Sequence, residues 1–132
     1  MHLRGIRGAA TAESNTQRAI LDTTRGLLTE MVRANQVEPD EVAAVFFTAT
    51  PDLTAVFPAE AAREMGWHAV ALLSSVEMDV PGALPRCIRI LLLWNTSRTQ
   101  EEVVHVYLDQ AQGLRPDRPE PRRRIATRDG AT

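Results

Sequence analysis

Two arginines are the most unusual chemical groups in this sequence. Arg89 interrupts the apolar run 87–94, and Arg7 stands beside Gly8 in a predicted strand. A buried guanidinium is costly unless a carboxylate, an interface or a ligand satisfies it. Each also has a structural explanation: an ion pair or a strand end that reaches water for Arg89, and a solvent-facing strand position for Arg7.

Four further residues carry groups that could act on a ligand, although each has an ordinary structural role too. Glu77 is a loop carboxylate, Tyr107 suits a core tyrosine with its hydroxyl at the edge, and Phe57 precedes a helix as a packing residue. Arg63 is a last-turn cation favoured by the helix dipole. Together with Arg7 and Arg89 they predict a guanidinium-rich site with one carboxylate, which suits a small polyanion because arginine donates paired hydrogen bonds to carboxylates.

The sequence lacks the residues that several kinds of chemistry require. The chain has no lysine, which excludes Schiff-base chemistry and a P-loop lysine. Its three histidines and single cysteine, Cys87, share no metal-ligand spacing. No nucleophile-elbow, dinucleotide or Walker motif occurs. We therefore expect neither a metal nor a cofactor.

The composition is that of an ordinary globular protein. The 132 residues are 44% hydrophobic and 24% charged, with a net charge of −2, enough for one domain with a real core. Nothing in this balance favours nucleic acid, for which the run 122–124 is weak support. The N-terminus lacks a signal-peptide pattern and no apolar stretch is long enough for a membrane span, so we expect a cytoplasmic protein.

Hydrophobic periodicity predicts the elements that must position these residues. We expect an α/β sandwich, in which one mixed sheet carries two helices on one face. The predicted strands cover 2–12, 42–50, 69–73, 87–94 and 105–108, and the predicted helices cover 16–34 and 59–65. The strands 42–50 and 87–94 would be central, and the first of them buried on both faces. A loop over 74–84 and a helical turn at 99–103 connect them, and 109–114 is a short terminal segment. We expect one domain, residues 1–115, followed by a flexible Pro- and Arg-rich tail, residues 116–132.

Four segments in order resemble the small trimeric, Bacillus-type class of chorismate mutase, which is α/β rather than all-helical. They cover most of residues 3–117, and no single motif among them is decisive. The segments are Arg4-Gly5-Ile6-Arg7-Gly8-Ala9, Ala49-Thr50-Pro51-Asp52-Leu53 through Phe57-Pro58-Ala59, Glu77-Met78-Asp79-Val80 through Cys87-Ile88-Arg89, and His105-Val106-Tyr107-Leu108 through Leu114-Arg115-Pro116-Asp117.

The resemblance implies a homotrimeric pseudo-α/β barrel whose sites lie between subunits and isomerise chorismate to prephenate, the step toward phenylalanine and tyrosine. It implies that Arg7 holds a substrate carboxylate, and that Arg89 reaches a carboxylate and the ether oxygen. Glu77 would accept from the ring hydroxyl and Tyr107 would bond the side-chain carboxylate. The remaining substrate-binding positions implied are Phe57, Leu73, Ser74, Ser75, Val76 and Leu114, with Arg63 and Arg115 at the mouth and the tail partly ordering over the ligand.

The missing nucleophile and base agree with this chemistry. A Claisen rearrangement needs no proton transfer, only a dicarboxylate held in its compact conformer. A fixed guanidinium would stabilise the charge that grows on the ether oxygen in the transition state. Three positions depart from the family pattern. Glu60 stands where some relatives have lysine, Ser74 replaces a cysteine, and Val104 stands where arginine is common.

Other functions stay open. A trimeric binding or regulatory protein on the same scaffold would sense an aromatic-pathway metabolite without turnover. A trimeric deaminase-like hydrolase would also place its site between subunits, although no residue here clearly activates water. Nucleic-acid binding by the tail is a more distant alternative.

Overall fold

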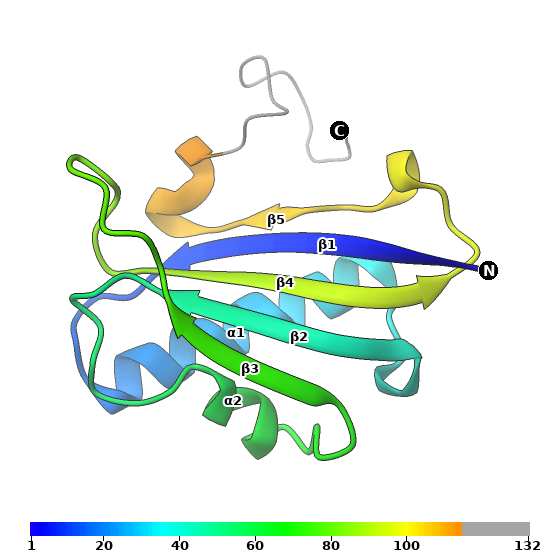
Figure 1. Cartoon of the computed structure of the whole chain (residues 1–132), viewed down its shortest axis with the longest axis horizontal. Helices are drawn as coiled ribbons and strands as arrows, with labels where there is room; N and C mark the ends of the chain where they lie inside the picture. The colour runs from blue at the N-terminus through cyan, green and yellow to red at the C-terminus, as the bar shows by residue number, and fades with distance from the viewer. Residues whose placement is uncertain (115–132) are drawn as a thin grey trace.

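The computed structural model describes residues 1–114, which form one five-stranded mixed sheet with both helices on the same face (Figure 1). The strand order is β3-β2-β4-β1-β5. β2 and β3 are parallel, as are β1 and β5, whereas β4 is antiparallel to both of its neighbours. The strands are β1 (His2–Thr11), β2 (Val42–Ala49), β3 (Ala71–Val76), β4 (Cys87–Thr96) and β5 (Val106–Tyr107).

The two helices cover one face of this sheet. α1 (Gln17–Asn35) begins where the Thr16 hydroxyl accepts a hydrogen bond from the backbone N–H of Ala19 at 3.1 Å, and it ends at Gln36, which is left-handed with φ 58°. α2 (Ala59–Glu64) follows Pro58, and the chain turns at Gly66 with φ 92°. Short 3-10 segments complete the fold at Pro39–Glu41, Gln100–Glu102 and Asp109–Leu114. The predicted architecture is thus confirmed.

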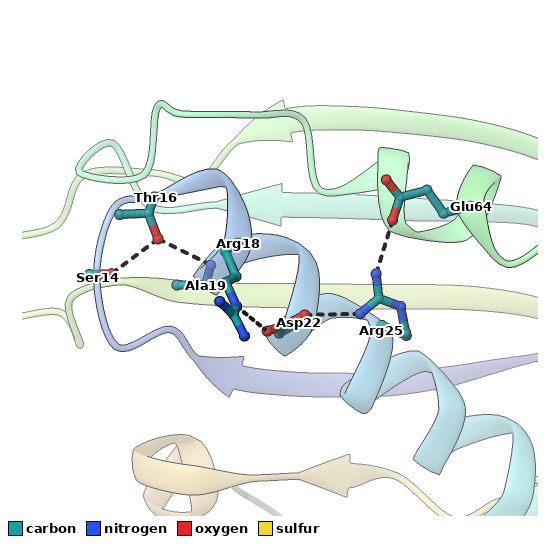
Figure 2. A network of polar contacts seen from close by, with 7 residues as sticks. All are labelled: Ser14, Thr16, Arg18, Ala19, Asp22, Arg25 and Glu64. Carbon is teal, nitrogen blue, oxygen red and sulfur yellow. Dashed lines mark hydrogen bonds and ion pairs between the residues drawn. The ribbon is translucent and has the colours of Figure 1, made fainter.

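A surface network joins the two helices. Figure 2 shows Arg25 between Asp22 of its own helix and Glu64 of α2, at 3.0 and 2.9 Å. Arg18 lies 3.8 Å from the other oxygen of Asp22. These side chains are largely solvated, so the network contributes about 1 kcal/mol or less per pair.

The core lies between the helices and the sheet. Its largest fully buried side chains include Ile6, Leu27, Met31, Phe47 and Leu92. Gly8 lets α1 approach β1 closely, because a Cβ there would lie 2.4 Å from the sulfur of Met31. Gly8, the glycine beside Arg7, therefore serves helix packing. It makes room on the face of the sheet that the helices cover.

Two sequence-based expectations are wrong. In the single chain, β2 is not buried on both faces of the sheet. Ala43 and Phe46 are exposed, because only one face of the sheet carries helices. The strand expected at 69–73 begins and ends later, so Ser74, Ser75 and Val76 belong to β3 and not to a loop. They pair with Phe47, Thr48 and Ala49 of β2, and this pairing overrides the weak strand preference of serine.

Two expectations concern features beyond the sheet. Within residues 1–114, neither helix is long and apolar enough to cross a bilayer. The predicted tail, residues 116–132, and the site residue Arg115 lie outside the described residues.

Candidate active site

The sheet face opposite the helices brings several predicted site residues into one row. The register pairs Thr48 with Ser75 on one side and with Arg89 on the other, and it pairs Ala9 with both Arg89 and Tyr107. Paired residues of neighbouring strands point to the same face. One row therefore crosses all five strands, in the order Ser75, Thr48, Arg89, Ala9 and Tyr107.

The adjacent row on the same face carries the second arginine. Arg7 pairs with Leu91, two residues along β4 from Arg89. Diagonal neighbours of this kind lie about 7–8 Å apart. Both guanidinium side chains are exposed, and neither forms an ion pair within residues 1–114. Of the partners considered for Arg89, a carboxylate ion pair does not occur within residues 1–114, which leaves water, an interface or a ligand.

Glu77 lies near Arg89 although it follows the edge strand β3. Its backbone N–H donates to the carbonyl of Ala49 at 2.9 Å, which continues the parallel pairing of β3 with β2 by one residue. Burial raises the pKa of the Cys87 thiol, while Arg89 lowers it and Glu77 raises it further, which places both charges around that thiol. The structure thus brings the carboxylate to the same part of the sheet as the guanidinium groups.

Tyr107 and Leu114 pack together at the β5 edge. Both are half-buried against a small cluster formed by Ala9, Cys87 and Ala111. Leu114 ends the 3-10 segment Asp109–Leu114, whose Ala111 is fully buried. The arginine group of the site consists of Arg7, Glu77, Arg89, Tyr107 and Leu114.

The remaining predicted residues gather at the opposite, β3 edge. A cavity of about 640 Å³ opens there between β3 and the segment that leads from β2 to α2. The Ser74 hydroxyl accepts from the backbone N–H of Ala59 at 3.3 Å, which ties the edge strand to the start of α2. The lining residues are Ala49, Pro51, Leu53, Thr54, Ala55, Val56, Phe57, Pro58, Ser74, Ser75 and Val76.

Two predicted residues of this edge do not line the cavity. Leu73 lies on the open face of the sheet, where it pairs with Phe46 and is 57% exposed. Arg63 stands in the last turn of α2 and donates to Glu60 at 3.2 Å. Glu60, which departs from the family pattern, thus provides a local carboxylate partner for that arginine.

Asn15 holds the cavity segment in place, and the sequence analysis assigned it no part in the site. Its side-chain oxygen accepts from the backbone N–H groups of Thr54 and Ala55 at 2.9 and 3.0 Å, and its amide donates to the Thr54 hydroxyl at 2.9 Å. Phe57, only two residues further on, is 72% exposed. An asparagine before a helix resembles a capping residue, so no sequence signal separates this role from an N-cap.

A second unpredicted network fixes the start of β4. The Thr50 hydroxyl donates to Asp52 at 2.6 Å and accepts from the backbone N–H of Cys87 at 3.0 Å. Asp52 also accepts from the backbone N–H of Arg86, a left-handed residue with φ 48°. The hydrogen bond from Thr50 is the main reason that the pKa of Asp52 lies below its usual range. This network positions the strand two residues before Arg89.

The outermost members of the two groups lie far apart in one chain. Ser75 and Tyr107 stand on the outermost strands, four strand spacings or about 19 Å apart. A molecule built on one six-membered ring cannot span that distance, although Ser75 stands only two strands from Arg89 and Val76 adjoins Glu77 in the chain. No cluster of three or more potential metal ligands occurs within residues 1–114.

Comparison with known proteins shows similarity over nearly the whole chain. The family model described as chorismate mutase type I matches residues 3–118. Chorismate mutase AroH of Thermus thermophilus is 57% identical over 116 residues, covering 87% of this chain and 95% of that protein. Chorismate mutase AroH of Bacillus subtilis strain 168 is 45% identical over 118 residues, covering 89% and 93%. The solved chorismate mutase from Clostridium thermocellum superposes with a TM-score of 0.82 at 45% identity and covers 83% of this chain and 98% of its own.

Proposed function

The chain belongs to the chorismate mutase type I family, and from this premise we propose how its own residues isomerise chorismate to prephenate in aromatic amino acid biosynthesis. The observation that carries the proposal is the pair Arg7 and Arg89, exposed on one face and without an ion pair in the described chain. Chorismate has two carboxylates, and two arginines whose strand positions lie about 7–8 Å apart suit such a dianion.

The first task of the site is to select a conformer. Chorismate must fold so that the two carbon atoms that will bond lie close together. Arg7 holds one carboxylate, Arg89 reaches a carboxylate beside it, and Tyr107 donates to the side-chain carboxylate. Because these groups come from three adjoining strands of one sheet, their spacing is set by the hydrogen-bonded register. The sheet therefore supplies the rigidity that positioning requires.

The second task is to stabilise the transition state. As the carbon–oxygen bond lengthens, negative charge grows on the ether oxygen, and Arg89 donates to it. Glu77 accepts from the ring hydroxyl and faces the complementary positive character of the ring. No proton moves and no covalent intermediate forms. These side chains act by interactions that strengthen in the transition state.

We further propose that the complete site forms between subunits of a homotrimer. The position of the cavity at the β3 edge supports this, because a neighbouring chain can bring that edge against the arginines of the first. In this arrangement Phe57, Leu73, Ser74, Ser75 and Val76 enclose a substrate held by the partner's arginine group. Arg63 and Arg115 stand at the mouth, and residues 1–115 make up the catalytic domain.

The open face of the sheet supports such an assembly. Its large apolar side chains stand exposed on a surface that spans four strands, and an apolar patch of this kind marks an interaction surface. They are Leu3 at 55%, Phe46 at 39%, Leu73 at 57% and Leu91 at 40%. Packing three such faces together would bury them. A cytoplasmic location stays a prediction of the sequence.

The direct test is the absorbance of chorismate after addition of purified protein, with prephenate identified as the product. Arg89→Ala is the informative variant, and it should lower kcat by about 10²–10³. Near-normal turnover by the folded variant would contradict the role of Arg89. A ligand that binds and is recovered unchanged from the wild type would instead favour a binding protein on this scaffold.

A further inference from the structure

Thr48 occupies the one polar position of the site row that the mechanism above leaves without a role. It lies on β2 between Ser75 and Arg89, and it points to the same face as both. Its hydroxyl oxygen is inaccessible to solvent and has no hydrogen-bond partner within residues 1–114. An unsatisfied buried hydroxyl is rare, because water is lost and nothing replaces it.

The neighbours of Thr48 differ in what they can offer it. The Ser75 hydroxyl already donates to the carbonyl of Val76 at 3.3 Å. Arg89, directly opposite on β4, carries five N–H donors, of which a carboxylate and an ether oxygen use only some. Cross-strand partners have Cβ atoms about 4.5–5.5 Å apart, which is within reach of an arginine. On the other side of Arg89 stands Ala9, whose side chain accepts nothing.

We propose that Thr48 is a positioning residue for Arg89, whose guanidinium donates to the Thr48 hydroxyl when chorismate is bound. This inference rests on the proposed function of Arg89. A guanidinium is planar, so a third contact on the β2 side fixes the orientation of its plane as well as its place. Fixing the plane matters because the donor must already face the ether oxygen when charge develops there.

The test compares Thr48→Val, which has nearly the same shape without the hydroxyl, with Thr48→Ser, which keeps it. Thr48→Val should lower kcat about ten-fold or more, the effect of losing one hydrogen bond to a charged group, with a smaller change in KM. Its Tm should equal or exceed that of the wild type, because a hydroxyl without a partner in the free chain has been removed. Thr48→Ser should recover most of the lost kcat.

The matched control is Thr24→Val in α1. Thr24 is a fully buried threonine whose hydroxyl donates to the carbonyl of Ile20 at 2.7 Å, on the far side of the sheet from the site. Its kcat should stay at the wild-type value. Molar mass by light scattering, recorded for every variant, shows whether the assembly is retained.

The outcomes separate the two claims. An active wild type with an equally active Thr48→Val variant overturns the positioning role alone. A Thr48→Val variant that loses activity together with its Tm or its oligomeric mass also overturns it, since the hydroxyl then serves the structure. A wild type that leaves chorismate unchanged overturns the proposed function and this inference with it.

Discussion

Arg7 and Arg89 are diagonal neighbours on the helix-free face of the sheet, Arg7 opposite Leu91 and Arg89 opposite Ala9. Like charges at this distance repel, and no carboxylate within residues 1–114 forms an ion pair with either. An anion bound between the two charges would relieve this repulsion. The register of β1 and β4 therefore sets the spacing of these two arginines on the open face.

The shape of the Arg89 side chain matters as well as its charge. Arg89→Lys should lower kcat/KM by about 10²-fold or more, because an ammonium cannot donate from a planar fork to two acceptors at once. Steady-state kinetics on chorismate check this. A lysine variant with wild-type kinetics would show that a single positive charge suffices.

Removing the Asn15 side chain should loosen the segment that lines the cavity. Asn15→Ala loses three hydrogen bonds to Thr54 and Ala55. Because these hydrogen bonds are exposed to solvent, we expect a loss of about 1 kcal/mol in the free energy of unfolding, together with a raised KM. Asn15→Asp keeps the acceptor and should lose less. Urea unfolding and steady-state kinetics rank the two variants by stability and by KM. An alanine variant as stable as the aspartate variant would contradict the role of the Asn15 oxygen.

The Asp52 network should make stability depend on acid pH. The pKa of Asp52 is lowered in the folded chain, first by the Thr50 hydroxyl and also by the backbone N–H of Arg86. Its stabilisation is therefore present above the unfolded pKa, about 3.9, and is lost as the pH falls through the lower folded value.

The variant Asp52→Asn tests that dependence. At pH 7 it should be less stable by about 1 kcal/mol, since the carboxylate is largely solvated and its hydrogen bonds are correspondingly weak. Urea unfolding should show the difference from the wild type narrowing below about pH 4. A difference that is constant down to pH 2 would mean that the charge of Asp52 contributes nothing.

We expect the subunits to assemble through the apolar side chains of the open face. Leu91→Glu places a charge in the middle of this face and should leave a folded chain of monomeric mass, since Leu91 is 40% exposed and lies outside the helix-side core. Light scattering and circular dichroism measure the two properties. The control is Thr29→Glu on the exposed surface of α1, which should keep the assembled mass. An assembled Leu91→Glu protein would argue that another surface joins the subunits.

The sequence predicts the elements well and makes Arg89 stand out, for reasons that are local. Arg89 stands out because a charge interrupts an apolar run, and α1 because its buried residues recur at helical spacing. The extent of β3 is missed because Ser74 and Ser75 have little strand preference of their own and depend on pairing with β2.

Other features depend on which strands become neighbours, and no local pattern encodes this. Thr48 is an unremarkable strand residue until the register sets it opposite Arg89. The placing of Ser75 and Tyr107 at opposite edges likewise follows from the strand order, which puts β3 and β5 at opposite ends of the sheet. Asn15 carries no sequence signal of its contact with Thr54, 39 residues away.

The claim that each site is shared between two chains can be tested by mixing two inactive variants. Arg89→Ala disables the arginine group, and Phe57→Glu places a carboxylate at the cavity, where a dianion would be repelled, at a residue exposed enough to leave the fold intact. Refolded together in equal amounts, the two chains should regain activity in about one quarter of the sites, those that combine an intact arginine group of one chain with an intact cavity of the next. Each variant refolded alone should stay inactive. A mixture no more active than its components would show that both groups act within a single chain and would contradict the shared site.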